Sequence, residues 1–287
     1  MAVEVVIPMD GMPDLMPIDF PFKATNVGES SIWVTAELVN PPSGWSNYSA
    51  QQLGELQAGV DDYFLFDTPQ RSKPTTGTTE QVTLRVKFYS DSGYTNLINQ
   101  DDVVFEFTYV DFEDTDVYDV VDDDTFELDT EGWQKVDELG SSSFGRDTGV
   151  SRTGTASMRH KLGTNNSSTG VYHLKKSFTI DNRSAAYIRV WLQVRHSNYL
   201  VPEFILEVIT DAEGVVQKRV IPIAMDKSPR GGTEIFEQWL CIGAKLPTNG
   251  TYEVRLRPRC EYCHRVYNGD RYTYIYYDDI RVVETKT

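Results

Sequence analysis

The chain has 287 residues, a formal net charge of −16 and a pI near 4.6. Its length suits two domains of ordinary size, and its 40% hydrophobic content is enough to bury two cores. A protein this acidic repels phosphate backbones and anionic lipid surfaces, so we expect neither nucleic acid nor a membrane among its partners. The sequence has no apolar run of membrane-spanning length, and its first residues predict a strand rather than a signal peptide.

Short strands separated by turn residues are predicted throughout the first half. The pattern is clearest at 81–89, where every second residue from Val82 to Phe88 is apolar. The predicted strands are residues 3–8, 20–26, 31–39, 63–66, 81–89 and 102–110. Short strands at this density predict an immunoglobulin-like β-sandwich over residues 1–112, with Trp33 as its core tryptophan. The only helix signal is a single turn at 49–54.

A short glycine motif lies inside this half, from Leu53-Gly54 to Ala58-Gly59, and an aromatic strand follows it. The motif resembles a turn found in prokaryotic immunoglobulin-like adhesion and envelope domains. The alternative is that Gly54 and Gly59 serve only as positions of positive φ.

An acidic segment follows at 113–124, and we predict it to be a solvated linker, because dense like charges extend a chain and oppose packing. Cation binding and a charged strap along a partner are the alternatives. The run Asp122-Asp123-Asp124 lacks the glycine and the terminal glutamate of an EF-hand loop, so that kind of site is excluded.

The second half, residues 125–287, is again rich in predicted strands. They are residues 125–128, 132–136, 157–161, 171–180, 186–195, 203–210, 215–223, 239–244, 250–257 and 272–283. Turn residues at 211–214 and the pair Asn249-Gly250 mark two hairpins. So many strands in one unit of this size predict a jelly-roll β-sandwich and an all-β chain.

Several short motifs of this half occur in the order and spacing seen in one group of jelly rolls. They are Phe126-Glu127 with Gly132-Trp133, residues 152–158 and 186–192, Trp239, residues 249–256, and the closing Tyr277-Asp278-Asp279-Ile280. Together they resemble the galactose-binding-like jelly rolls of carbohydrate-binding module families. The resemblance covers slightly over half of the chain.

The resemblance implies a structural Ca²⁺ ion that joins the first and last strands. Its ligands would be Glu127 and Asp279, with the backbone carbonyls of Arg152 and Thr155 nearby. The alternative is that Asp278 and Asp279 cap the strand end and pair with Arg281 or Arg255.

The resemblance also implies sugar binding by aromatic side chains that pack against the CH faces of the sugar rings. The candidates are Trp191, Tyr199, Trp239, Tyr262, Tyr267 and Tyr272. For each of them the alternative is an ordinary place in the core. Members of these families also include structural spacers, so the fold alone does not fix the activity.

Cys260, Cys263 and His264 form a C-x-x-C-H pattern, which is typical of covalent haem attachment. The predicted β context and the lack of a helix to orient His264 speak against haem. With Cys241 the same residues make a Cys₃His set for Zn²⁺, although Cys241 is far away in sequence. The remaining alternative is a loop-closing disulfide or free thiols, and we favour it over both cofactors.

The sequence holds no nucleophile elbow, phosphate loop or dinucleotide fingerprint, so we expect a protein that is not an enzyme. We predict a structural and adhesive protein of an extracellular assembly, such as a surface, tail or decoration component of a phage or archaeal virus. Its partners would be other virion subunits and a cell-surface glycan. The alternative is a pair of carbohydrate-binding modules from a secreted glycosidase or cell-wall protein.

Overall fold

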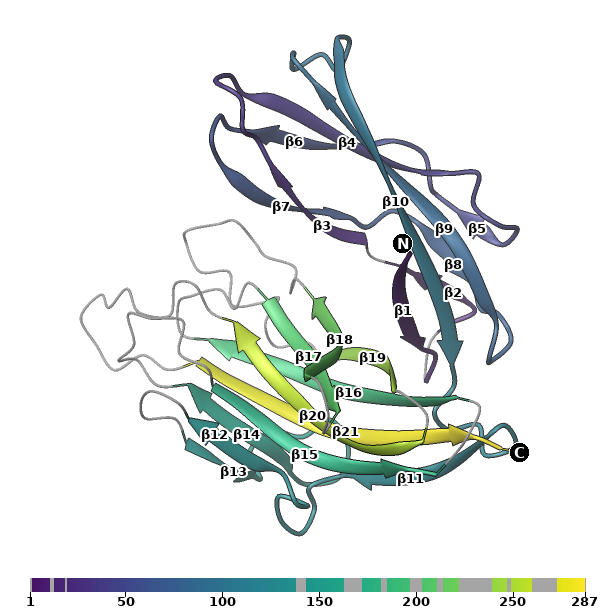
Figure 1. Ribbon diagram of the computed structural model, residues 1–287, viewed down its shortest axis with the longest axis vertical. Coiled ribbons are helices and arrows are strands. Elements are labelled where there is room, and N and C mark those ends of the chain that lie inside the picture. The colour runs from purple at the N-terminus through teal and green to yellow at the C-terminus, as the bar shows by residue number, and fades with distance from the viewer. Residues whose placement is uncertain are drawn as a thin grey trace, which may run out of the picture. The chain divides into compact units, whose positions relative to one another are not determined.

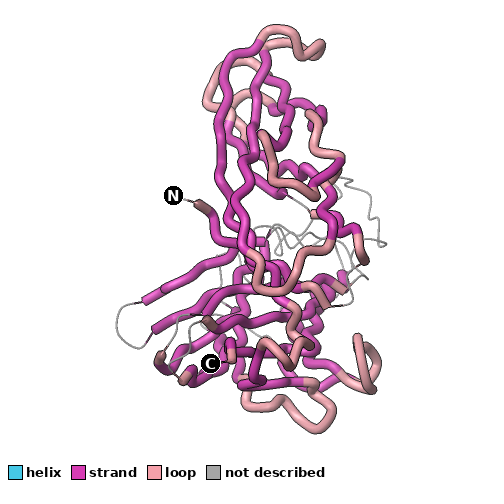
Figure 2. The backbone as a smooth tube through the Cα atoms, turned by 90° about the vertical axis from the view of Figure 1, so that its right-hand side faces the viewer, coloured by secondary structure: helices cyan, strands magenta, loops and turns pink. Residues whose placement is uncertain are grey.

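The computed structural model describes residues 2–10, 13–18, 20–137, 143–162, 172–181, 185–196, 203–210, 214–221, 239–246, 249–259 and 273–286. These residues form strands and loops and no helix (Figure 2). The predicted all-β class is therefore confirmed. The chain divides into two compact units, Met1–Asp111 and Phe112–Thr287. Each unit is described by itself below.

Unit 1 is a sandwich whose larger sheet contains five strands (Figure 1). In sheet order they are β1 (Val3–Pro8), β10 (Leu97–Val110), β9 (Thr79–Tyr89), β4 (Ile32–Val39) and β6 (Gln51–Leu56). β1 runs parallel to β10, and the other pairs are antiparallel. The opposite layer is made of two small sheets. They are β3 (Phe20–Thr25) with β7 (Asp61–Phe66), and β2 (Leu15–Pro17), β8 (Gln70–Ser72) and β5 (Trp45–Ser46).

Aromatic side chains fill the space between the layers of unit 1. The ring of Phe20 lies 5.3 Å from that of Phe105 and 5.5 Å from that of Phe107, and both contacts are edge-to-face. Trp45 is 7% exposed and packs on Phe107, whereas Trp33 lies outside the buried set. The prediction of Trp33 as the core tryptophan is therefore wrong, because Trp33 points away from the layer that Trp45 joins.

A buried carboxylate ties the small sheet of unit 1 to the large one. Glu80 accepts hydrogen bonds from Trp45 Nε1 at 3.0 Å, Arg71 Nε at 2.9 Å and Tyr109 Oη at 2.7 Å. Its side chain is 9% exposed, and that of Arg71 is 11% exposed. Burial and the neighbouring Glu80 raise the pKa of Tyr109 far above its ordinary value, so Tyr109 stays a hydrogen-bond donor.

The glycine motif and the predicted helical turn both take part in strand structure. Residues Gln51–Leu56 form β6, so the helical turn at 49–54 is wrong; pairing with β4 overrides the weak local signal. Gly54 has a φ of 115° and Gly59 a φ of 69°. Residues other than glycine rarely adopt such positive φ values. The two glycines therefore serve as positions of positive φ, which is the alternative given above for the motif.

Unit 2 is a sandwich of two larger sheets (Figure 1). The first sheet has the order β13 (Ser143–Asp147), β14 (Ser157–Leu162), β21 (Thr273–Thr285), β16 (Ala186–His196) and β19 (Leu240–Leu246), and β11 (Tyr118–Asp124) also pairs with β21. The second has the order β12 (Gln134–Asp137), β15 (Tyr172–Ile180), β20 (Gly250–Arg259), β17 (Glu203–Thr210) and β18 (Gly214–Ile221). From β14 to β17 each strand lies in the opposite sheet from the one before it, which is the connection pattern of a jelly roll.

The core of unit 2 lies between its two sheets. On β16 the residues Ile188, Val190 and Leu192 belong to this core and are at most 1% exposed. On β21 the core residues are Ile275, Tyr277, Ile280 and Val282. The residues between them therefore face the other way, since successive side chains of a strand point to opposite sides.

The acidic segment at 113–124 contains a strand, so its prediction as a solvated linker is wrong. Tyr118–Asp124 forms β11, which pairs antiparallel with the last strand of the chain. Cations from other strands neutralise its charges: Arg281 pairs with Asp123 at 2.6 Å, and Lys176 pairs with Asp122 at 2.7 Å and Asp124 at 2.6 Å. These partners are remote in sequence, which is why the charge run alone was misleading.

Candidate functional site

The candidate site is the outer face of the first sheet of unit 2, meaning the face turned away from the core cluster. β14, β21, β16 and β19 supply it with alternate residues. The described side chains on this face include Arg159, Lys161, Tyr274, Tyr276, Trp191, Gln193 and Cys241. Trp239 is partly exposed and directly precedes β19, so it lies outside the strand register. Of the predicted sugar-binding residues, Trp191 thus belongs to this surface.

The register aligns these residues in rows across the strands. Tyr276 stands opposite Arg159 of β14 on one side and Gln193 of β16 on the other. Two residues before Tyr276 on β21, Tyr274 stands opposite Lys161 of β14. Tyr276 and Gln193 are 7% and 3% exposed and form the floor of the face. Tyr274, Trp191 and Trp239 are partly exposed, so aromatic surface and hydrogen-bonding groups alternate along the sheet.

Arg159 is held in place at the edge of the aromatic row. Its Nη1 donates to Oδ2 of Asp147 at 2.5 Å, and its guanidinium carbon lies 5.7 Å from the ring centroid of Tyr274. The side chain of Arg159 is nevertheless 40% exposed, while that of Asp147 is 14% exposed. Asp147 therefore orients the guanidinium.

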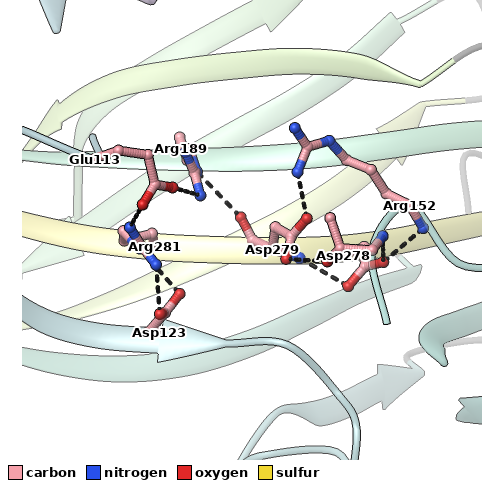
Figure 3. Close-up of polar contacts among 8 residues, drawn as sticks. Glu113, Asp123, Arg152, Arg189, Asp278, Asp279 and Arg281 are labelled. Atoms are coloured by element: carbon pink, nitrogen blue, oxygen red, sulfur yellow. Dashed lines mark hydrogen bonds and ion pairs between the residues drawn. The ribbon is translucent and has the colours of Figure 1, made fainter. Parts of the chain in front are cut away.

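Next to this row the last strand carries a β-bulge. Between Arg189 and Trp191 on β16 the pairing with β21 shifts by one residue, and Asp279 adopts a φ of 46°. Asp278 accepts hydrogen bonds from the backbone N–H groups of Arg152 at 2.7 Å and Thr153 at 3.3 Å (Figure 3). Burial raises the pKa of Asp278 to about 7. The bulge thus fastens the loop that contains Arg152 to the last strand.

Arg152 bridges the bulge and the outer face. Its Nη1 pairs with Oδ2 of Asp279, whose side chain is 9% exposed (Figure 3). The guanidinium carbon lies 3.7 Å from the ring centroid of Trp191. One face of the Trp191 ring is therefore covered by a cation. A sugar ring can pack against that face only if Arg152 moves.

Glu127 holds the other end of the same loop. It accepts hydrogen bonds from Thr155 N at 2.8 Å, Thr155 Oγ1 at 2.7 Å and Ala156 N at 3.2 Å, and the Thr155 hydroxyl is the main reason its pKa lies below the usual value. Gly154 permits this approach, because its φ is 59° and a Cβ there would lie 2.1 Å from Oε1 of Glu127. The loop is thus fixed by Glu127, which lies between β11 and β12, and by Asp278 and Asp279 on the last strand.

The predicted Ca²⁺ ligands do not fit an ion in this arrangement. Both oxygens of Glu127 accept from the loop, and those of Asp279 accept from Thr153 Oγ1 at 2.8 Å and from Arg152. Ca²⁺ needs six to eight oxygen ligands, and a guanidinium already neutralises Asp279. Among the residues that the structure describes, no group of three His, Cys, Asp or Glu side chains is placed to hold a metal. The Ca²⁺ site predicted from the sequence is thus untested, and these hydrogen bonds argue against it.

The alternative partners predicted for the closing acids are wrong. Asp279 pairs with Arg152, while Arg255 hydrogen-bonds to Glu253 on the other sheet. Arg281 pairs with Asp123 and with Glu113, and Glu113 also binds Arg189 at 2.8 Å (Figure 3). Although burial opposes it, hydrogen bonds from Arg189 and Arg281 hold the pKa of Glu113 below its usual value. This network joins β11, β16 and β21 beside the bulge.

Several predicted site residues lie outside the described part of the chain. They are Tyr199, Tyr262, Tyr267, Tyr272, Cys260, Cys263 and His264. Cys241 lies on β19 opposite Trp191. The haem, zinc and disulfide hypotheses therefore stay untested, as does the role of these tyrosines.

Sequence reasoning missed Arg159, Tyr274, Tyr276 and Gln193 as members of the site. The alternation of side chains along β14 and β21 could have placed Arg159 and the two tyrosines on the sheet face that points away from the core. Their adjacency could not have been found, since β21 lies more than 100 residues from β14 in sequence and the pairing is set by the whole sheet. No candidate membrane-spanning helix occurs in the described residues.

No protein-family model matches the chain, and no curated protein matches it either. Among solved structures, it is similar to the CBM22-1 xylan-binding domain of Paenibacillus barcinonensis Xyn10C, with 12% identity over 60% of this chain and 97% of that one and a TM-score of 0.37. The K1 cleaved adhesin domain of Lys-gingipain from Porphyromonas gingivalis W83 shows 16% identity over 56% of this chain and 95% of that one, with a TM-score of 0.38.

The CBM22-1–CBM22-2 tandem of the same Paenibacillus protein covers 100% of this chain and 98% of its own, at 9% identity and a TM-score of 0.39. Scores this low do not establish a shared fold or function. The sandwich architecture given above stands on the strand pairing of this chain itself.

Proposed function

We propose that the chain is a non-enzymatic, glycan-binding adhesive protein of an extracellular assembly, with the outer face of unit 2 as its binding site. One observation carries the proposal: Trp191, Tyr274 and Tyr276 share a sheet face with Arg159 and Gln193, on the side opposite the core. Sugars combine apolar CH faces with many hydroxyls. Aromatic rings pack against the apolar CH faces, and guanidinium and amide groups form hydrogen bonds with the hydroxyls.

The arrangement suits an extended ligand better than a small one. The row formed by Gln193, Tyr276 and Arg159 crosses the three neighbouring strands β16, β21 and β14, which lie about 4.8 Å apart. A row of this kind is longer than a single sugar ring. A polysaccharide that runs across the strands would contact an aromatic or polar group at each step.

Equilibrium binding of the full chain to a panel of soluble polysaccharides tests this proposal. Trp239→Ala and Tyr274→Ala should each weaken binding about tenfold, which corresponds to about 1.4 kcal/mol. Tyr48→Ala is the matched control, because Tyr48 is an exposed aromatic of unit 1 (40%) and should leave the affinity unchanged. If no polysaccharide binds, or if both unit 2 variants bind like the wild type, the proposal is wrong.

We place this binding activity in a virion, as part of a surface, tail or decoration structure, where the partners would be other virion subunits and a cell-surface glycan. A pair of carbohydrate-binding modules on a secreted glycosidase or cell-wall protein would use the same face. Antibodies against the purified chain distinguish the two settings. Labelling of purified virus particles supports the first, and labelling only of a secreted glycosidase supports the second.

A further inference from the structure

A lysine from one sheet of unit 2 meets two aspartates from the other. Lys176 lies on β15 of the second sheet, and its Nζ lies 2.6 Å from Oδ1 of Asp124 and 2.7 Å from Oδ2 of Asp122. Both aspartates lie on β11, which pairs with β21 of the first sheet. The side chains of Lys176 and Asp124 are 14% and 3% exposed. An amine and a carboxyl group are thus held against each other away from water.

Core residues surround this amine and this carboxyl group. Nζ of Lys176 lies 5.2 Å from the ring centroid of Phe178, and Trp133 Nε1 donates to Oδ2 of Asp124 at 2.8 Å. Both aromatic residues belong to the core cluster of unit 2. Burial raises the pKa of Asp124 to about 7, so its neutral carboxylic acid, the form that an amine attacks, is present at neutral pH. Charges next to a core are costly, and a neutral linkage would remove them.

Two other lysine–carboxylate pairs show what is particular to Lys176. Nζ of Lys87 lies 2.6 Å from Oε1 of Glu37 in unit 1, but the two side chains are 24% and 25% exposed. Lys175 and Glu253 are 3.0 Å apart and also reach solvent. Lys176 combines the same short distance with burial and with two carboxyl groups. One of these groups can react with the amine while the other moves protons.

We propose that Lys176 and Asp124 form an intramolecular amide bond, with Asp122 as the acid–base group, so that the two sheets of unit 2 become covalently joined. Nζ forms a bond to Cγ of Asp124, and the bond from Cγ to the hydroxyl oxygen breaks. Asp122 accepts a proton from the ammonium group of Lys176, donates it to the departing hydroxyl, and then accepts the last proton that the nitrogen loses. The products are the amide, one water molecule and one proton released to solvent.

Proximity supplies most of the rate. Although burial opposes it, hydrogen bonds with Asp122 and Asp124 hold the pKa of Lys176 above its usual value, so the attacking amine is a minor form and the reaction is slow. Well-oriented groups within one molecule nevertheless react as if present at about 10⁵–10⁸ M. The bond forms once in each chain. Before it forms, Asp124 titrates as a carboxyl group, so the dependence of stability on its protonation is a property of the unlinked chain.

The intact mass of the full chain tests the proposal. After prolonged incubation of the folded protein at neutral pH, the chain should be lighter than its sequence by one water molecule, and a peptide map should show β11 joined to β15. Lys176→Arg keeps a cation between the aspartates, but a guanidinium stays protonated and does not attack a carboxyl group, so this variant should keep its full mass. Lys87→Arg is the matched control and should lose water as the wild type does.

Asp122→Asn tests the acid–base role separately. It keeps the reacting pair but removes the group that moves protons, so the loss of water should be about 100-fold slower. An unchanged rate contradicts the role given to Asp122.

Two results would overturn the amide bond itself. One is a folded wild-type chain that keeps its full sequence mass after incubation. The other is a loss of water that persists in Lys176→Arg, because the water would then come from another part of the chain. The peptide map of the wild type needs no variant to fold, and neither measurement depends on glycan binding.

Discussion

Arg152 supplies a positive charge at the bulge of the last strand, and its removal gives the sharpest test of how unit 2 is held together. Arg152→Met keeps most of the side-chain volume and the backbone N–H that binds Asp278, but it leaves Asp279 without its cation. Breaking a fully buried ion pair costs about 3–5 kcal/mol. Because 25% of the Arg152 side chain is exposed, we reduce this to about 2–3 kcal/mol.

For a unit of this size, about 1 kcal/mol shifts the melting temperature by roughly 2–4 °C, so Arg152→Met should lower that of unit 2 by about 4–12 °C. Scanning calorimetry measures the shift. Arg255→Met is the control: Arg255 pairs with Glu253 on the other sheet, both side chains are partly exposed, and the loss should stay below about 1 kcal/mol. A shift below 1 °C for Arg152→Met would refute the reasoning.

The same experiment addresses Ca²⁺. With Arg152 present, a chelator should leave the melting temperature unchanged, since the guanidinium already neutralises Asp279. A fall in the melting temperature on chelation, abolished in Asp279→Asn, would instead establish the Ca²⁺ site predicted at Glu127 and Asp279.

Three further predictions concern stability. Glu80→Ala should destabilise unit 1 by about 3–5 kcal/mol in urea unfolding, because it leaves the Arg71 guanidinium buried without its carboxylate; an unchanged midpoint would contradict the network. Burial, together with a neighbouring carboxylate, raises the pKa of Asp124 to about 7, so its neutral form favours the folded state. The stability that Asp124 contributes is thus present at low pH and is lost as the pH rises toward 7, at no more than about 1.4 kcal/mol per pH unit. Asp124→Asn should flatten this slope between about pH 4 and 7, and an identical slope in both proteins would argue against it. Gly154→Ala should cost about 1–3 kcal/mol through backbone strain and the clash with Glu127, whereas Gly145→Ala, which meets no atom within 4 Å, should cost less than about 1 kcal/mol; equal effects would refute the role of Gly154.

The sequence alone was enough to predict most strands, since the period-2 pattern of apolar residues reports burial on one side. It failed where pairing overrides local signals. β6 has weak strand propensity and forms because β4 binds its backbone. β11 is a run of acids, and it becomes a strand because Arg281, 158 residues away, neutralises Asp123.

The candidate site shows the same limit. Trp191 and Trp239 were found as aromatic residues on predicted strands; Trp191 lies on the outer face, and Trp239 directly precedes β19. That Arg152 covers Trp191 could not be predicted, because the loop of Arg152 is placed by Glu127, Asp278 and Asp279 together. The neighbourhood of Arg159 and Tyr276 likewise depends on a register that no single segment determines.

Hydrogen–deuterium exchange with and without a bound polysaccharide tests the central claim most directly, because it shows which strands the glycan covers. Binding at the outer face should slow exchange in peptides from β14, β16 and β21, and leave unit 1 and the sheet of β15 and β20 unchanged. Protection confined to unit 1 or to the β15–β20 sheet, under conditions where the polysaccharide is bound, would contradict the placement of the glycan site.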